Sequence, residues 1–444
     1  MDSALDPNQA SLSDVAVWLF AGNLVGGGRY MIASGTQLAD GNRQTLDDLF
    51  RRAGVRRADA MALSDPSRSL TFAQADCAIS ALAVRLRALG LATDAVVATH
   101  LPNSVEGAIA LLGILRAGMI VAPLPLLWRQ KDVVAALSHI GAKAIVTFDG
   151  QADIAMQVAA ELFQIRAIAG FGRDLPDGVV PLDDVFMSGA TEFFQPSTRR
   201  SAAHAAAITF DITLDGIVPV TRSHSELIAG GLSAFREAGI AQDETILSSI
   251  PPSSFAGIAI TLVTWLFGGG TLALHHGFDP VIFAEQCRAH DAMTVVLPGP
   301  ALTAIVGAGL LNQLKTVLAL WRVPEQLVAA APWQGDAALT DIASFSETDL
   351  LAARRGPDGM PASIPDDAAD GLVRVGFYRF RQDGIDVAVT AADPDAIIAA
   401  LPDALLGQRL AGSAPTPADI ATQLQDRGVH ALIAGAFRLR PKAA

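Results

Sequence analysis

Residues 205–224 contain the side chains best suited to hold an anion. A β-rich run over residues 205–210 leads to a loop at Asp215-Gly216, a second short strand and a helix that begins at Ser223. In nucleotide-using proteins, such loops bind phosphates through backbone N–H groups, hydroxyls and a basic side chain. The residues of this stretch that could bind an anion are Thr213, Gly216, Arg222 and His224.

The acidic residues of the same stretch favour a different interpretation. Asp211 and Asp215 would lie near a bound phosphate, and two like charges ~4 Å apart cost about 4 kcal/mol at an effective dielectric of about 20. A loss of that size corresponds to roughly thousandfold weaker binding of the phosphate. Mg²⁺ could bridge a carboxylate and a phosphate, and Arg222 could replace a lysine. The favoured interpretation is nevertheless a plain β-hairpin with Asp215-Gly216 as its turn.

The composition indicates a globular protein with a large core. The 444 residues are 51% apolar and 17% charged, which predicts two to three domains or subdomains held by apolar packing. The net charge of −13 argues against nucleic acid or an anionic membrane as a partner. The most apolar windows, 15–25 and 255–267, are shorter than the ~18 to 20 residues that span a bilayer. With two cysteines, a disulfide framework is not expected, and we expect a cytoplasmic protein.

Helices and strands alternate along most of the chain. Thr71 and Gln74 predict a capping box, and Ile79, Leu82 and Leu86 share one helix face. The predicted helices are 45–53, 71–89, 103–117, 130–140, 223–237, 255–267 and 281–290. The predicted strands are 60–64, 95–100, 120–123, 144–148, 245–249, 271–275 and 292–297. This rhythm indicates parallel sheets with right-handed crossovers, covered on both faces.

The last part of the chain differs in composition from the rest. Pro and Asp cluster over residues 357–370, Asp383-Gly384 separates two short strands in a predicted hairpin, and a helix is expected from Thr416. We therefore predict an irregular arm over residues 1–44, a large domain over 45–355, a linker over 356–370 and a reduced C-terminal domain over 371–444.

Several scaffold segments resemble one known family. They are Leu70-Thr71-Phe72, Leu101-Pro102-Asn103-Ser104-Val105-Glu106, Leu112-Gly113-Ile114-Leu115-Arg116-Ala117-Gly118, Gly141-Ala142-Lys143-Ala144, Leu266-Phe267-Gly268-Gly269-Gly270-Thr271 and Phe278-Asp279-Pro280. Over about residues 45–350 the chain resembles the adenylate-forming (AMP-binding) acyl-CoA synthetases. The resemblance implies an α/β fold with two doubly wound sheets, and a truncated C-terminal α+β remnant.

The resemblance also implies a reaction and its cofactors. In the family, a carboxylate and ATP give an acyl-adenylate and pyrophosphate, and a thiol such as coenzyme A then takes the acyl group. ATP or AMP, Mg²⁺ and coenzyme A are the implied cofactors, and a small carboxylate or acyl compound is the implied ligand. Fold-level resemblance does not fix activity, which depends on the residues at each device of the reaction.

The phosphate loop is the first device. The family pattern is a Thr/Ser/Gly-rich loop that ends Gly-x-Pro-Lys-Gly, and residues 205–224 take its place. Thr213 and Gly216 remain and Pro219 is displaced, whereas the lysine is absent. Ile212 and Val220 stand where glycines would let the backbone approach a phosphate.

The second device is the family's Tyr-Gly-x-Thr-Glu loop. In this chain, Phe345-Ser346-Glu347-Thr348-Asp349 resembles it. By resemblance, Thr348 would meet a phosphate and Asp349 would hold Mg²⁺. Phe345 lacks the tyrosine hydroxyl. As a bare motif, Thr-Asp is also typical of a helix cap.

The adenine shelf and the acyl site are also altered. Trp321, with a side chain of roughly 150 to 250 Å², and Leu320 stand where the family has small residues beneath the nucleotide base. Their bulk predicts a pocket that is filled or reshaped. By resemblance, the substrate pocket would be lined by Ser253, Ser254, Phe255, Leu320, Trp321 and Phe345. The two serines are equally explained by a plain turn and helix cap.

The mobile C-terminal lid is the last device. The residues after Asp349 contain no ribose-binding Thr-Gly-Asp and no Gly-Arg-x-x-Asp hinge. Lys442 lies next to a terminus that is expected to fray, which argues against a role as the catalytic lysine. The catalytic residues are therefore unknown.

Three hypotheses for the function remain. The leading one is a catalytically impaired acyl-CoA synthetase-like protein that binds an acyl or adenylate-like ligand, or a partner. The alternatives are an active carboxylic acid–CoA ligase with a divergent phosphate loop, and a structural subunit of a genuine synthetase. A homodimer is also compatible with the sequence, and whether the protein is an enzyme stays open.

Overall fold

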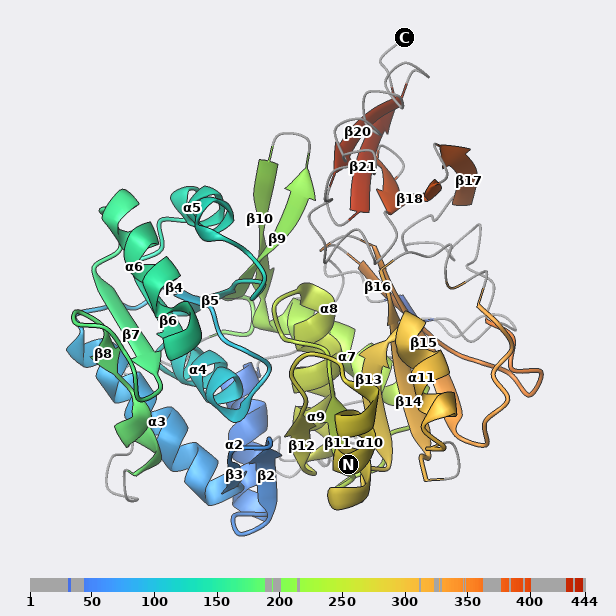
Figure 1. Cartoon of the computed structure of the whole chain (residues 1–444), viewed down its shortest axis with the longest axis horizontal. Coiled ribbons are helices and arrows are strands. Elements are labelled where there is room, and N and C mark those ends of the chain that lie inside the picture. The colour runs from blue at the N-terminus through green and yellow to red at the C-terminus, as the bar shows by residue number, and fades with distance from the viewer. Residues whose placement is uncertain are drawn as a thin grey trace, which may run out of the picture.

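The computed structural model describes residues 44–187, 194, 201–213, 216–310, 313–322, 327, 330–345, 347 and 349–361. It also describes strand β1 (Met31–Ile32) and five strands between residues 377 and 441. These residues form three sheets, two of which have helices packed around them (Figure 1). No helix in this part of the chain is both long and apolar enough to cross a membrane.

The first sheet has seven strands in the order β10-β9-β5-β4-β6-β7-β8. All its pairings are parallel except that of β9 with β10. The strands are β4 (Val96–Thr99), β5 (Ile120–Pro123), β6 (Ala144–Phe148), β7 (Ala167–Phe171), β8 (Val180–Pro181), β9 (Ala205–Thr213) and β10 (Gly216–Ser223). Its helices are α3 (Phe72–Ala88), α4 (Val105–Arg116), α5 (Gln130–Ser138), η1 (Asp149–Gln151), α6 (Ala152–Glu161) and η2 (Asp183–Phe186).

The second sheet has nine strands in the order β1-β16-β15-β14-β13-β11-β12-β2-β3. Its centre is parallel and its outer pairings are antiparallel. The strands are β2 (Met61–Ser64), β3 (Ser69–Thr71), β11 (Ile246–Ser248), β12 (Leu272–Leu274), β13 (Thr294–Pro298), β14 (Thr316–Trp321), β15 (Ala338–Phe345) and β16 (Asp349–Arg354). The helices of this half are α2 (Leu46–Arg56), α7 (His224–Ala238), α8 (Phe255–Gly257), α9 (Thr264–Gly268), α10 (Pro280–Ala289), η4 (Gly299–Ala301) and α11 (Leu302–Gly307).

The third sheet is antiparallel throughout, in the order β17-β18-β19-β21-β20. Its strands are β17 (Phe377–Gln382), β18 (Ile385–Asp393), β19 (Ala396–Ala400), β20 (Val429–Ile433) and β21 (Ala436–Pro441). Gln382 pairs with Ile385, which confirms the predicted hairpin around Asp383-Gly384. The helix predicted from Thr416 lies outside the described residues. The predicted domain boundaries stay predictions.

The doubly wound architecture predicted from the alternating pattern is confirmed. β5 and β6 have the predicted bounds, and the side chain of Thr71 accepts the backbone N–H of Gln74 as the capping box requires. The prediction contained no element between β6 and β9, where the structure has α6, β7 and β8. The buried face of α6 consists of Ala152, Ala155 and Val158, and these small side chains give a weak apolar period.

The predicted helix 255–267 is present but is not a regular α-helix. Its middle, η3 (Ile258–Val263), is a π-helix between α8 and α9. This segment packs closely on α7, where a Cβ atom added to Gly231 would lie 2.4 Å from the side chain of Val263 and 2.7 Å from the carbonyl oxygen of Ala259. The two helices approach this closely because α7 has glycine at the contact.

Gly231→Ala is therefore expected to destabilise the fold by about 1 to 3 kcal/mol, because the methyl group would overlap both a buried side chain and a backbone carbonyl. Gly307→Ala is the matched control: it lies in α11 and an added Cβ has no atom within 4 Å. The control should gain up to about 1 kcal/mol from the better helix propensity of alanine. Urea unfolding measures both, and equal stabilities of the two variants would contradict the predicted close contact.

Aromatic side chains of three helices pack against one another in the core. Trp265 of α9 is fully buried, with ring centroids 5.9 Å from Phe50 of α2 and 6.0 Å from Phe72 of α3. The indole Nε1–H of Trp265 donates to the carbonyl oxygen of Gly270 at 2.8 Å. The polar edge of the ring is therefore satisfied within an apolar cluster.

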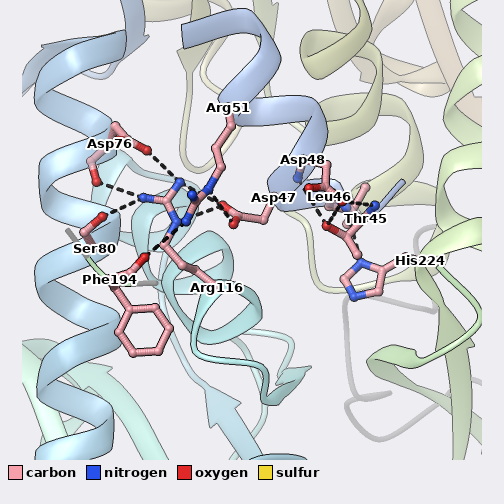
Figure 2. Close-up of polar contacts among 10 residues, drawn as sticks. All are labelled: Thr45, Leu46, Asp47, Asp48, Arg51, Asp76, Ser80, Arg116, Phe194 and His224. Atoms are coloured by element: carbon pink, nitrogen blue, oxygen red, sulfur yellow. Dashed lines mark hydrogen bonds and ion pairs between the residues drawn. The ribbon is translucent and has the colours of Figure 1, made fainter. Parts of the chain in front are cut away.

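Arg116 at the end of α4 links this helix to α2 and α3 (Figure 2). Its side chain has no exposed surface, and Nη2 lies 2.8 Å from Oδ1 of Asp47 and 2.7 Å from Oδ1 of Asp76. Nη1 donates to the hydroxyl of Ser80 at 2.8 Å. Figure 2 also shows Leu46, whose N–H donates to Nδ1 of His224 at 3.3 Å. These contacts fix α2 between the two halves of the fold.

Candidate functional site

The stretch predicted to hold an anion or to form a hairpin is a hairpin. β9 and β10 pair antiparallel from Ser223 up to the pair Thr213–Gly216. Gly216 is the first residue of β10 and pairs with Thr213, so its predicted place in the turn is wrong. Asp215, the other residue of the predicted turn, lies outside the described residues. Backbone groups that pair along two strands do not form the glycine-rich loop that surrounds a phosphate with N–H groups.

Two buried carboxylates link this hairpin to the nine-stranded sheet. Asp211 on β9 is 9% exposed, and Glu347, between β15 and β16, is 6% exposed. The backbone N–H of Glu347 donates to Oδ1 of Asp211 at 3.0 Å, and Oε2 of Glu347 accepts the N–H of Phe255 at 2.5 Å. A residue between two strands of one sheet is therefore bonded to the other sheet and to the start of α8.

The environment of Glu347 favours its neutral form. Burial raises the pKa of Glu347 to about 7, and the negative charge of Asp211 acts in the same direction. The positive charge of Arg322 and the hydrogen bond from Phe255 oppose this rise in the pKa. A second negative group in this place, such as a phosphate, would add to the repulsion.

Arg222, the candidate replacement for the missing lysine, is held by protein groups. Its Nη2 donates to the carbonyl oxygen of Glu347, and Nη1 lies 3.3 Å from Oε1 of Glu226. The guanidinium carbon lies 4.7 Å from the centroid of the Phe255 ring. Arg222 is 7% exposed, so it is an internal cation between the two sheets. Its role in binding a phosphate stays a prediction.

The two serines predicted for the acyl pocket lie at the start of α8. Ser254 is the N-cap, and its Oγ accepts the N–H of Gly257 at 3.0 Å. The same hydroxyl lies 3.2 Å from Nη2 of Arg322. Ser253 is half-buried in the preceding turn, and Phe255 is 2% exposed. The cap geometry matches the plain interpretation of the serines, and the pocket role stays a prediction.

Leu320 and Trp321 do not fill one pocket together. Neighbouring residues of β14 point to opposite faces of the sheet, and the two side chains belong to different apolar clusters. A Cβ atom at Gly299 would lie 2.3 Å from the Trp321 ring, so the indole covers the backbone of η4. The expectation that Leu320 adds bulk beside Trp321 is therefore wrong.

The indole of Trp321 is hydrogen-bonded to a buried ion pair. Its Nε1–H donates to Oδ1 of Asp341 at 2.8 Å, and Oδ2 of Asp341 lies 2.7 Å from Nε of Arg355. The side chains of Asp341 and Arg355 are 1% and 2% exposed. Burial raises the pKa of Asp341, although Arg355 and Trp321 both oppose the shift. Nη1 of Arg355 also donates to the carbonyl oxygens of Ala331 and Gly359 at 2.9 and 3.1 Å.

The remaining predicted residues are described only in part. Phe345 and Asp349 are paired at the ends of β15 and β16, and Thr213 and Gly216 are paired in the hairpin. Thr348 lies outside the described residues, as do the side chains of Phe345, Asp349 and Thr213. Within the part of the chain that is described, no three His, Cys, Asp or Glu side chains gather where they could hold a metal ion.

These residues do not fit a nucleoside triphosphate. Its phosphates would meet two paired strands, two buried carboxyl groups and an arginine already bonded to the protein. The sequence indicated the charge of Asp211, whereas no local pattern predicted a role for Glu347 or Arg322. One signal was available: along β9, Ile208 and Phe210 lie in the apolar cluster on one face, so alternation places Thr209 and Asp211 on the other.

Comparisons with known proteins agree with this fold. Residues 50–193 match the model of the AMP-binding enzymes, described as "AMP-binding enzyme". The chain is 24% identical to a sulfoacetate–CoA ligase of Cupriavidus necator over an aligned segment of 235 residues. This segment covers 51% of this chain and 43% of the ligase. It is 34% identical to a long-chain-fatty-acid–CoA ligase of Escherichia coli over 119 residues. This segment covers 27% of this chain and 21% of the ligase.

A solved structure extends the match to most of the chain. ATP-bound MatB from Rhodopseudomonas palustris superimposes with a TM-score of 0.59 at 18% identity, over 79% of this chain and 70% of MatB. The chain thus spans less than half the length of each of the two ligases that it matches in sequence. The matched family segment and the two ligases support the placement of this chain in the adenylate-forming, AMP-binding family, and the solved structure shows that the layered fold is shared.

Proposed function

We propose that this protein is a catalytically impaired acyl-CoA synthetase-like protein of the cytoplasm. It keeps the large domain of its family and acts by binding an acyl or adenylate-like ligand, or a partner protein, without forming acyl-adenylates from ATP. The observation that carries the proposal is the hydrogen bond between Glu347 N–H and Asp211. This bond and the paired hairpin support the proposal, because by resemblance Asp211 and Glu347 belong to the two segments that would meet the phosphates of ATP.

Pyrophosphate exchange into ATP tests the loss of adenylation. With a panel of aliphatic, aromatic and sulfonated carboxylic acids and Mg²⁺, exchange should stay at the level of the protein-free control. A long-chain-fatty-acid–CoA ligase assayed with its own acid serves as the positive control. Robust exchange at low protein concentration would overturn the proposal and favour an active ligase with a divergent phosphate loop.

Ligand binding separates the remaining forms of the proposal. Thermal unfolding is measured with ATP, AMP, a set of carboxylic acids and a non-hydrolysable acyl-adenylate analogue. A ligand that binds only the folded state raises the unfolding midpoint, and the rise grows with the logarithm of one plus the ratio of its free concentration to its Kd. A shift with the acid or the analogue and none with ATP supports a binding protein. No shift with any of them, and co-purification of a full-length synthetase, favours a structural subunit.

A further inference from the structure

His224 lies where two helices begin. It is the first residue of α7 and is 4% exposed, and its Nδ1 accepts the backbone N–H of Leu46, the first residue of α2, at 3.3 Å (Figure 2). The backbone N–H of His224 itself donates to the carbonyl oxygen of His204 at 3.2 Å. One buried histidine therefore joins α2, α7 and the segment that leads into β9.

The bond from Leu46 fixes the protonation state of the ring. A backbone amide can only donate, so Nδ1 of His224 is the unprotonated nitrogen and the proton of the neutral ring is on Nε2. An imidazolium carries a proton on both nitrogens. It would lose the bond to Leu46 and bring two N–H groups face to face. The docked ring is therefore the neutral form of the histidine.

Both helices oppose a positive charge at this place. The N-terminus of an α-helix carries a partial positive charge of roughly half a unit, which disfavours a nearby cation. His224 is in the first turn of its own helix and beside the first residue of α2, so an imidazolium would meet two such termini at once. The burial of His224 adds a desolvation cost to the charged form.

The carboxylates in the turns that meet the ring are engaged elsewhere. Asp48 and Glu226 each accept the N–H of the N-cap residue of their own helix, at 2.9 and 2.7 Å. Asp47 forms an ion pair with the buried Arg116 at 2.8 Å. The titratable and charged groups of these turns and of the chain next to them are Asp47 and Asp48 of α2, Glu226 of α7, Arg222 of β10 and His204.

We propose that His224 is an acid-sensitive joint: α2 is docked on α7 while the imidazole is neutral, and protonation of the ring releases the start of α2. In the released state the ring takes up a proton near pH 6.5, as an ordinary histidine does. The docked ring takes up none without losing its bond. The free energy of docking is therefore fully present above this pH and decreases as the pH falls below it.

The release of α2 affects more than one bond. Asp47 lies in the same turn of α2 as Leu46 and is one of two carboxylate partners of Arg116, the other being Asp76 of α3. Movement of this turn would leave the buried guanidinium with Asp76 alone. The joint thus couples the protonation of one histidine to the packing of α2 on α3 and α4. It does not depend on whether the protein uses ATP.

Amide hydrogen exchange of the full-length protein tests the joint. Protection factors of the α2 amides are measured at pH 7.5 and pH 5.0, after correction for the intrinsic effect of pH on exchange. In the wild type they should fall by about ten- to thirtyfold, the upper figure being the limit for a proton bound only in the released state.

Two histidine variants isolate the group responsible. His224→Asn keeps an oxygen acceptor near the place of Nδ1 and does not titrate, so protection of its α2 amides should fall by less than about threefold. His139→Asn, at an exposed histidine after α5, is the matched control and should behave like the wild type. The same dependence on pH in the wild type and in His224→Asn would overturn the proposal.

Two variants of Leu46 test the bond from its donor side. Leu46→Pro removes the N–H that the imidazole accepts, and proline is tolerated at the first position of a helix. The preceding residue, Thr45, has an extended backbone (φ −91°, ψ 168°) that suits a following proline. Leu46→Ala shortens the same buried side chain and keeps the N–H. Only Leu46→Ala should retain the wild-type dependence of α2 exchange on pH.

The two comparisons are independent. If His224→Asn does not fold, the two Leu46 variants decide alone. An equal dependence on pH in Leu46→Pro and Leu46→Ala would show that the bond to His224 does not control the docking of α2.

Discussion

Asp341→Asn is expected to destabilise the fold by about 3 to 5 kcal/mol, the usual effect of leaving one charge of a buried ion pair without its partner. The pair is 1% and 2% exposed and has a 2.7 Å contact between Oδ2 and Nε. An asparagine leaves the guanidinium of Arg355 charged, because arginine does not release its proton in a protein. The penalty therefore cannot be relieved by a change of protonation.

The opposite variant, Arg355→Met, is expected to be the milder of the two. It leaves Asp341, whose pKa burial already raises, and this carboxyl can take up a proton and become neutral. Methionine also fills the apolar part of the space that the arginine stem leaves.

Urea unfolding followed by circular dichroism measures both variants at neutral pH. The half-exposed pair Arg68–Glu106, with a 3.1 Å contact, is the control, and Glu106→Gln should cost less than about 1 kcal/mol. Equal losses for Asp341→Asn and Arg355→Met would contradict the argument.

The second large effect is expected from pH. The pKa of Glu347 in the folded chain, about 7, is above its ordinary value of 4.5. Between these two values the folded state binds the proton more tightly than the unfolded state does. The contribution of Glu347 to stability is therefore fully present below about pH 4.5 and is lost as the pH rises through 7. The loss from this group amounts to roughly 3 kcal/mol at most.

The measurement compares wild type with Glu347→Gln at pH 5.5 and pH 8. Other groups titrate in both proteins, so the difference between the two slopes isolates Glu347. The stability of the wild type should fall from pH 5.5 to pH 8 by more than that of the glutamine variant, which stays neutral throughout. Gly307→Ala, which changes no titratable group, should keep the wild-type slope. Parallel slopes for wild type and Glu347→Gln would refute the raised pKa.

Much of the scaffold could be predicted because its signals are local. The capping boxes of α3 and α7 depend on residues three apart in the sequence, and β5 and β6 are short apolar runs with clear ends. The hairpin β9–β10 was the favoured interpretation of residues 205–224 and is confirmed. Gly216 was predicted to be a turn residue because Asp-Gly is a strong turn signal, whereas the strand pairing includes it.

The internal cluster of the site could not be predicted, because it depends on partners far apart in the chain. Glu347 and Asp211 are separated by 136 positions, and Arg322 and Ser254 by 68. Local patterns do not identify such pairs. The family resemblance placed the elements correctly and directed attention to the residues that the family conserves in its motifs. Glu347 stands at the variable position of its motif, so the comparison gave it no role.

The pairing of the β9–β10 hairpin has a consequence for any attempt to restore a phosphate loop. Backbone N–H groups that are committed to a strand ladder cannot also donate to a phosphate. Because β9 and β10 pair as far as Thr213 and Gly216, the return of a lysine alone would leave the strands paired. Regaining the loop would require the strand pairs to separate as well, with glycines in place of side chains such as Ile212 and Val220. The loss of the loop can therefore be reversed only by several substitutions made together.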